Sequence, residues 1–309
     1  MAGVRKLIRS HGLPLAFLGV SGYFLASIIL EKGYSLTTED DLFETFTAVF
    51  YAVASLLCLV GFATARGRVA SVGRYATLGW AALFFLFAME EVSWGQRILG
   101  LETPGFLVTH NLQEEINLHN FASHDVNRLF YASVFLVGMA LPFLAMLKGR
   151  VGSLIGRWGV PLPQSDLIVP FALASAFVSL AWVAMAPEAG LLIAIALLAF
   201  AFALKSDSME RYGMSKGLSK LHLWMGLGGV GLIQIVLKQY EDNLGHINQP
   251  IEIKEFLFSA CFLVFAFRVG GISRLPVALW SRASHGQSLS PSSTGTAPES
   301  ASPRVESDG

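Results

Sequence analysis

The alternation of basic and acidic connections between apolar runs constrains this chain most, because it predicts a membrane topology and a sidedness together. Crossing a hydrocarbon core takes about 20 residues in a helix. Runs of about this length occupy residues 13–30, 42–63, 75–89, 129–147, 167–186, 191–204, 221–237 and 251–269. Basic connections, the first with Arg5, Lys6 and Arg9, alternate with acidic or nearly neutral ones. The sequence therefore predicts an all-α bundle of about eight transmembrane helices.

The positive-inside rule sets the orientation of this bundle. It places the N- and C-termini in the cytoplasm and the connections 31–41, 90–128 and 239–250 outside. The two cysteines, Cys58 and Cys261, lie within apolar runs and not in these outer connections. Together with the charge bias, this favours a multi-pass protein of the bacterial inner (cytoplasmic) membrane. Membrane lipid is the expected partner, and no nucleic acid is expected.

Composition supports the same class and sets the domain organisation. The chain has 309 residues, of which 53% are hydrophobic and 14% charged, with a formal net charge of zero. Eight helices and their connections fill nearly all of this length, so we expect an integral membrane domain over residues 1–282 and no separate soluble catalytic domain. Residues 283–309 are rich in Ser and Pro, without apolar periodicity. They are expected to form a disordered cytoplasmic tail.

The first candidate site lies where the third apolar run meets the outer surface. Glu90 and Glu91 directly follow a very apolar segment. Neighbouring side chains of a helix project about 100° apart, so at least one of the two carboxylates should point into the bundle. Ionisable groups near membrane depth usually face a cavity or a partner. If the helix continues, Glu90, Ser93, Trp94 and Arg97 share one face. The structural alternative is that Trp94 anchors the helix at the interface while Arg97 neutralises a glutamate.

The second candidate site lies in the same outer connection, where residues 111–120 are expected to form a short interfacial helix between spans 3 and 4. Asn111 and Glu114 have the spacing of a capping box. Glu115 and His119 are four residues apart and project from one helical face. Such a pair can exchange protons or bind a divalent metal ion. The alternative is an ordinary exposed pair without a function.

Further candidates lie near the starts of the last two spans. Pro250 and Glu252 suit the first turn of the eighth span, where the helix dipole favours an acidic residue. Glu255 lies about one turn deeper and would face the cluster around Glu90. His222, at the cytoplasmic end of the seventh span, is interpreted as a local helix-end feature.

These positions give three hypotheses for function. The leading one is a metal-dependent or acid-base enzyme that acts on a lipid or lipid-linked substrate at the outer membrane interface. Its catalytic candidates are Glu90, Glu91, Ser93, Arg97, Glu115 and His119, and its candidate ligands for a divalent metal ion are Glu91, Glu115, His119 and Glu255. We expect Glu90, Glu91, Glu115 and His119 to converge in one outward-opening pocket.

Two other classes remain open. An ion- or proton-coupled transporter would use the same carboxylates, but it requires ionisable or unwound positions deep within several spans. A structural or assembly protein would use residues 90–120 to dock a partner. Its polar residues would then only satisfy one another.

Overall fold

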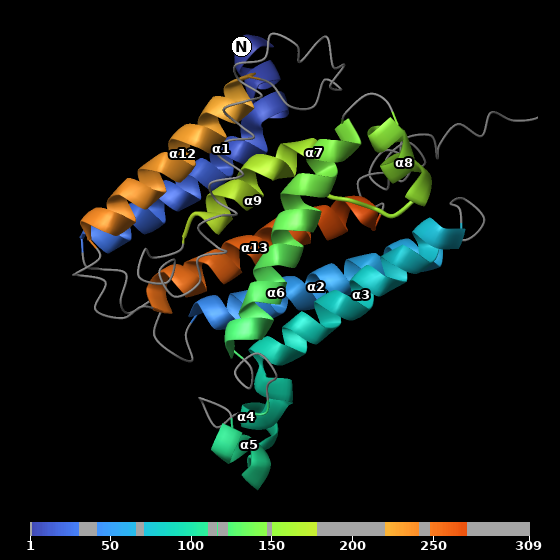
Figure 1. The fold of residues 1–309 in the computed structure, drawn as a ribbon, viewed down its shortest axis with the longest axis vertical. Helices are drawn as coiled ribbons and strands as arrows, with labels where there is room; N and C mark the ends of the chain where they lie inside the picture. Colours follow the sequence, from blue (N-terminus) through green and yellow to red (C-terminus); the bar gives the residue numbers. More distant parts are fainter. Residues whose placement is uncertain are drawn as a thin grey trace, which may run out of the picture. The chain divides into compact units, whose positions relative to one another are not determined.

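The structure, a computed structural model, describes residues 2–30, 42–65, 71–110, 116, 123–146, 150–177, 220–240 and 248–270. Within these ranges every assigned element is helical, which confirms the all-α prediction for this part of the chain (Figure 1). The elements are α1 (Ala2–Ile29), α2 (Leu42–Thr64), α3 (Ser71–Glu91), η2 (Ser93–Gly95), α4 (Gln96–Leu99), α5 (Gly105–His110), α6 (Ser123–Phe135), η3 (Leu136–Ala140), α7 (Leu141–Met146), α8 (Arg150–Trp158), η4 (Ser165–Leu167), α9 (Ile168–Ser175), α12 (Lys220–Gln239) and α13 (Asn248–Val269). All of these elements belong to one compact unit over residues 1–272.

Four of the described helices are long and apolar enough to cross a membrane: α1, α2, α3 and α12. They correspond to the predicted runs 13–30, 42–63, 75–89 and 221–237 and support a membrane location. The run 129–147 corresponds to α6, η3 and α7, which contain a shorter apolar stretch, Leu129–Ala145. The run 251–269 lies in α13, which is equally long but more charged. The run 191–204, most of 167–186 after α9, and the predicted tail 283–309 lie outside the described residues.

Helices α2, α3 and α13 pack side by side (Figure 1). Helices α2 and α3 are antiparallel, and the Ser55 hydroxyl on α2 donates a hydrogen bond of 2.8 Å to the Ala81 carbonyl on α3. Helices α2 and α13 run in the same direction. Near their starts, the rings of Phe43 and Phe256 lie 5.1 Å apart, and near their ends a Cβ on Gly61 would lie only 2.9 Å from the Val269 carbonyl oxygen. Both helices therefore begin at the end of the bundle where α3 finishes, which we call the carboxylate end.

Helices α1 and α12 form a second pair, also side by side in Figure 1, and both contact α9. Gly229 of α12 makes this close packing possible, because a Cβ there would overlap Leu173 of α9 and lie 2.8 Å from Leu18 of α1. The later part of α1 reaches the carboxylate end, where Phe24 lies 5.4 Å from Phe43 between ring centroids. Small residues such as Gly229 allow helices to pack closely where they cross in membrane bundles.

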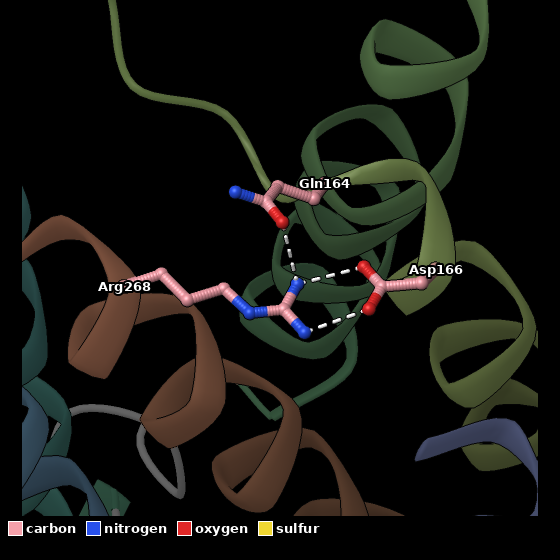
Figure 2. A network of polar contacts seen from close by, with 3 residues as sticks. All are labelled: Gln164, Asp166 and Arg268. Carbon is pink, nitrogen blue, oxygen red and sulfur yellow. Dashed lines mark hydrogen bonds and ion pairs between the residues drawn. The ribbon is translucent and has the colours of Figure 1, made fainter. Parts of the chain in front are cut away.

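A polar clamp fixes the opposite end of α13 to the segment that leads into α9. The Arg268 guanidinium donates two hydrogen bonds of 2.7 Å to the Asp166 carboxylate and one of 3.1 Å to the Gln164 side-chain oxygen (Figure 2). The two Arg–Asp bonds are parallel and bidentate, which gives them directional strength. Because Asp166 lies directly before α9, the clamp sets where α9 starts against α13.

The helix formed by α6, η3 and α7 contains one wide turn, and the sequence explains it. Pro142 has no backbone N–H and its ring crowds the carbonyl four residues earlier, so the normal bond to Gly138 is lost. The Leu141 N–H bonds instead to the Leu136 carbonyl, five residues back. Gly138 in this turn faces the Phe171 ring, where a Cβ would lie 2.7 Å from the ring. The turn therefore lets this helix approach α9 closely.

Candidate functional site

Carboxylates from three helices gather at the carboxylate end. Glu91, the last residue of α3, interacts electrostatically with Glu44 of α2 and with Glu252 and Glu255 of α13, as well as with its neighbour Glu90. Glu44 lies in the first turn of α2, and the two α13 glutamates lie in its first two turns. The parallel packing of α2 and α13 beside the end of α3 is what assembles the group. We call these five residues the carboxylate cluster.

A buried lysine lies beside the carboxylate cluster. Lys254 of α13 is only 1% exposed, and its Nζ atom lies 3.7 Å from the centroid of the Tyr131 ring of α6. This distance is typical of a cation–π contact. The charge of Lys254 also interacts with Glu252 and Glu255. Buried charges require such compensation, so the lysine and the carboxylates stabilise one another.

Two tyrosines complete the surroundings of the carboxylates. Tyr51 of α2 is 1% exposed and interacts electrostatically with Glu91 and Glu255. Tyr131 of α6 interacts with Glu252 and Glu255. Four helices, α2, α3, α6 and α13, thus contribute acid-base groups to one end of the bundle.

The chain leaves α3 through a strained left-handed turn. Ser93, Trp94 and Gly95 have φ angles of 46°, 56° and 76° in succession. The left-handed region is uncommon for residues other than glycine, and strain of this kind often occurs at functional sites. Trp94 Nε1 donates a hydrogen bond of 2.6 Å to Glu90 Oε1, and Ser93 is 2% exposed. The turn therefore holds Glu90 in place at the edge of the cluster.

This turn corrects one expectation from the sequence. Because α3 ends at Glu91 and the backbone then becomes left-handed, no continuous helical face runs from Glu90 through Ser93 to Arg97. Arg97 belongs to the separate short helix α4, and its side chain lies outside the described residues.

The start of the following loop is fixed by Gln96. Its side-chain Nε2 donates a hydrogen bond of 2.6 Å to Thr103 Oγ1, and its Oε1 accepts one of 2.7 Å from the Ile116 backbone N–H. The predicted helix 111–120 lies outside the described residues except for Ile116, and Glu115 and His119 lie outside them too. Their convergence with Glu90 and Glu91 stays a prediction.

Of the four predicted metal ligands, the structure describes two and leaves two outside the described residues. Glu91 and Glu255 interact electrostatically, whereas Glu115 and His119 lie outside the described residues. Within the described ranges, no group of three or more His, Cys, Asp or Glu side chains is arranged to hold a metal ion. What the described residues do provide is a set of ionisable side chains at one end of the bundle.

Sequence reasoning did not select Lys254, Tyr51 or Tyr131 for this site. A signal for Lys254 was present, because it follows Ile253 and precedes the apolar run that starts at Phe256. A lysine inside an apolar helix is a functional candidate by default. The two tyrosines lie in apolar runs, and only the packing of the helices shows that they meet the carboxylates.

Comparison of the chain with protein-family models, with curated proteins and with solved structures gave no match. The function must therefore be argued from the geometry of the site.

Proposed function

We propose that this chain is a membrane-embedded enzyme that performs acid-base chemistry on a lipid or lipid-linked substrate. The observation that carries the proposal is the gathering of Glu44, Glu90, Glu91, Glu252 and Glu255 around one bundle end beside buried Lys254. Five carboxylates and one lysine leave excess negative charge. A proton, a cation or a cationic group of a substrate would balance it.

The proposed roles follow from position. Glu91 interacts with the four other members of the carboxylate cluster, and it would take up or release the proton. Lys254, held over the Tyr131 ring, would offset part of the negative charge of Glu252 and Glu255 and so keep these carboxylates close together. Trp94 donates a hydrogen bond to Glu90 and so fixes the position of this carboxylate at the edge of the cluster.

The depth of the cluster fits a lipid-linked substrate. Helix α3, a candidate span, ends at Glu91, while α2 and α13 begin at the same end. The cluster therefore lies where membrane-spanning helices end, at the level of lipid headgroups. The positive-inside rule favours the outer face of a bacterial inner membrane for this end, with both chain termini in the cytoplasm.

The test uses the full chain reconstituted in vesicles of bacterial total lipid extract. Lipid composition is followed over time by mass spectrometry for the wild type, Glu91→Gln and Lys254→Met. We expect a lipid species to change with the wild type and its rate to fall by roughly 100-fold in Glu91→Gln, since removing a general acid or base has effects of this size. Glu102→Gln is the matched control, because Glu102 is an exposed carboxylate in the loop. Equal conversion by all four proteins, or by none, would contradict the proposal.

One observation favours a proton-coupled transporter as a second candidate. That class requires ionisable groups within the bundle, and Lys254 is such a group, because it is almost fully buried among α6 and α13 residues. The same vesicles, loaded with a pH-sensitive dye and given a membrane potential, distinguish the two functions. Proton flux that Glu91→Gln abolishes, without any change in lipid composition, would support transport over catalysis.

A further inference from the structure

Two histidines from distant parts of the sequence meet between α1 and α12. His11 Nδ1 and His222 Nε2 lie 2.9 Å apart, within hydrogen-bond distance. The two rings are tilted by 55° with centroids 4.4 Å apart, so they are not stacked flat. His222 is 3% exposed and His11 is half-buried. His222 lies in the first turn of α12, as expected of a helix-end feature, but its contact is not local, because its ring meets His11 of α1.

This histidine pair is separate from the carboxylate cluster. Phe24, which packs at the carboxylate end, lies 13 residues after His11 in α1. At 1.5 Å per residue this is about 20 Å along the helix. The pair and the cluster are therefore independent sites, and the inference below does not depend on the proposed function.

We infer that His11 and His222 form a two-histidine site for a divalent transition-metal ion such as Zn²⁺ or Cu²⁺. Neutral imidazole is the most common side-chain ligand for such ions, and Zn²⁺ and Cu²⁺ both favour it. Metal–nitrogen bonds are about 2.0–2.1 Å long, so two imidazole nitrogens on one ion lie roughly 2.9 Å apart at a right angle and about 3.4 Å apart in a tetrahedron. The observed separation of 2.9 Å lies within this range.

The helices on both sides hold the two rings in this arrangement. Two turns after His222, Gly229 brings α12 against Leu18 of α1 and Leu173 of α9. This close packing fixes α12 against α1 in the same region as the pair. An ion bonded to both nitrogens would lie to one side of the line that joins them, and the two rings would turn toward it while the packed helices keep their places. Water would complete its coordination, as at the open positions of catalytic zinc sites.

The first experiment titrates the purified full chain with Cu²⁺ in detergent and records electron paramagnetic resonance spectra. We expect one strongly bound Cu²⁺ per chain with hyperfine splitting from two imidazole nitrogens. His11→Gln and His222→Gln should each weaken this binding by roughly tenfold or more, since one of two ligands is lost. His124→Gln is the matched control and should bind Cu²⁺ like the wild type, because His124 belongs to α6.

The second experiment needs no variant. Zn²⁺ should shield the half-buried His11 of the wild type from modification by diethyl pyrocarbonate. Unchanged Cu²⁺ binding in both variants, a spectrum without nitrogen splitting, or equal modification with and without Zn²⁺ would each overturn the inference.

Discussion

Helices α12 and α13 are similar in length but opposite in environment. Helix α12 has 20 residues and exposes large apolar side chains, with Trp224 60%, Leu232 55% and Ile235 69% exposed. Helix α13 has 22 residues, and Phe267 is its one exposed side chain among those the structure describes. Yet α12 is apolar enough to be a candidate membrane span, whereas α13, with the charged residues near its start, is not. The apolar character of these two helices therefore does not follow their burial in the bundle.

The physical reason is the availability of partners. Helix α12 is a candidate membrane span, and lipid beside its exposed face would offer no group that can stabilise a charge. Helix α13 packs against α2 and α9, and protein groups surround it. Lys254 contacts the Tyr131 ring there and interacts with neighbouring carboxylates. A central helix can therefore carry charges that a peripheral helix cannot, and the following predictions test this difference.

The largest effect is expected from Phe262→Ala in α13. The Phe262 ring is 2% exposed and lies between 5.1 and 6.4 Å, centroid to centroid, from the rings of four other helical residues: Tyr51, Trp80, Phe84 and Phe171. Its removal should lower the free energy of unfolding by about 3–5 kcal/mol. Ile235→Ala in α12 is the control and should change it by less than about 0.5 kcal/mol, since lipid replaces the lost methyl groups. Unfolding by sodium dodecyl sulfate in mixed micelles measures the free energy of both variants. Equal losses of stability would contradict the difference between α13 and α12.

A charge placed on α12 should have the next largest effect. Ile235→Lys puts an ammonium group on an exposed apolar face of a candidate span, and we expect an insertion penalty of up to about 2.5–3.5 kcal/mol, which is the cost at the centre of a spanning helix. Lys254→Met removes the natural charge from α13 and should leave membrane insertion unchanged, because it adds no charge to an exposed apolar face, although it takes a stabilising cation away from Glu252 and Glu255. The membrane-inserted fraction of each variant, measured by carbonate extraction, tests this. Full insertion of Ile235→Lys would show that this face of α12 does not contact lipid.

Neighbouring glycines on α12 provide a sharper test of its packed face. Gly229→Leu should lower the free energy of unfolding by about 1–3 kcal/mol, because the new side chain meets Leu173 and Leu18. At Gly228 a Cβ would meet nothing within 4 Å, so Gly228→Leu should be nearly neutral. The same unfolding assay measures both variants. A similar loss at the two positions would mean that α12 does not pack through Gly229.

The smallest effect is expected from the clamp that joins α13 to the start of α9. The Arg268 and Asp166 side chains are 25% and 29% exposed, so solvent weakens their bidentate pair (Figure 2). Asp166→Asn should lower the free energy of unfolding by about 0.5–1 kcal/mol at low salt, and less at high salt. A double-mutant cycle with Arg268→Gln isolates the pair. A coupling energy of zero at low salt would show that the clamp does not stabilise α13.

Particular residues show how far the sequence predicted the site. The position of Glu90 and Glu91 at the end of an apolar run was readable, because α3 ends where its apolar pattern ends. Lys254 carried a signal, but the sequence offered no partner for it. Tyr131 lies 123 residues earlier in the chain, and no local pattern joins the two. His11 and His222 are 211 residues apart and show the same limit.

The sequence by itself determined that this chain forms long apolar helices, which suggest a membrane location, because apolar composition and the spacing of charged connections are local properties. It also determined where α1, α2, α3 and α12 lie along the chain. Only the tertiary structure decided that α13 is central, that carboxylates from α2, α3 and α13 gather beside Lys254, and that His11 meets His222. These outcomes depend on which helix faces touch, and helix contacts depend on the fit of side chains from distant segments, such as Gly229 against Leu18 and Leu173.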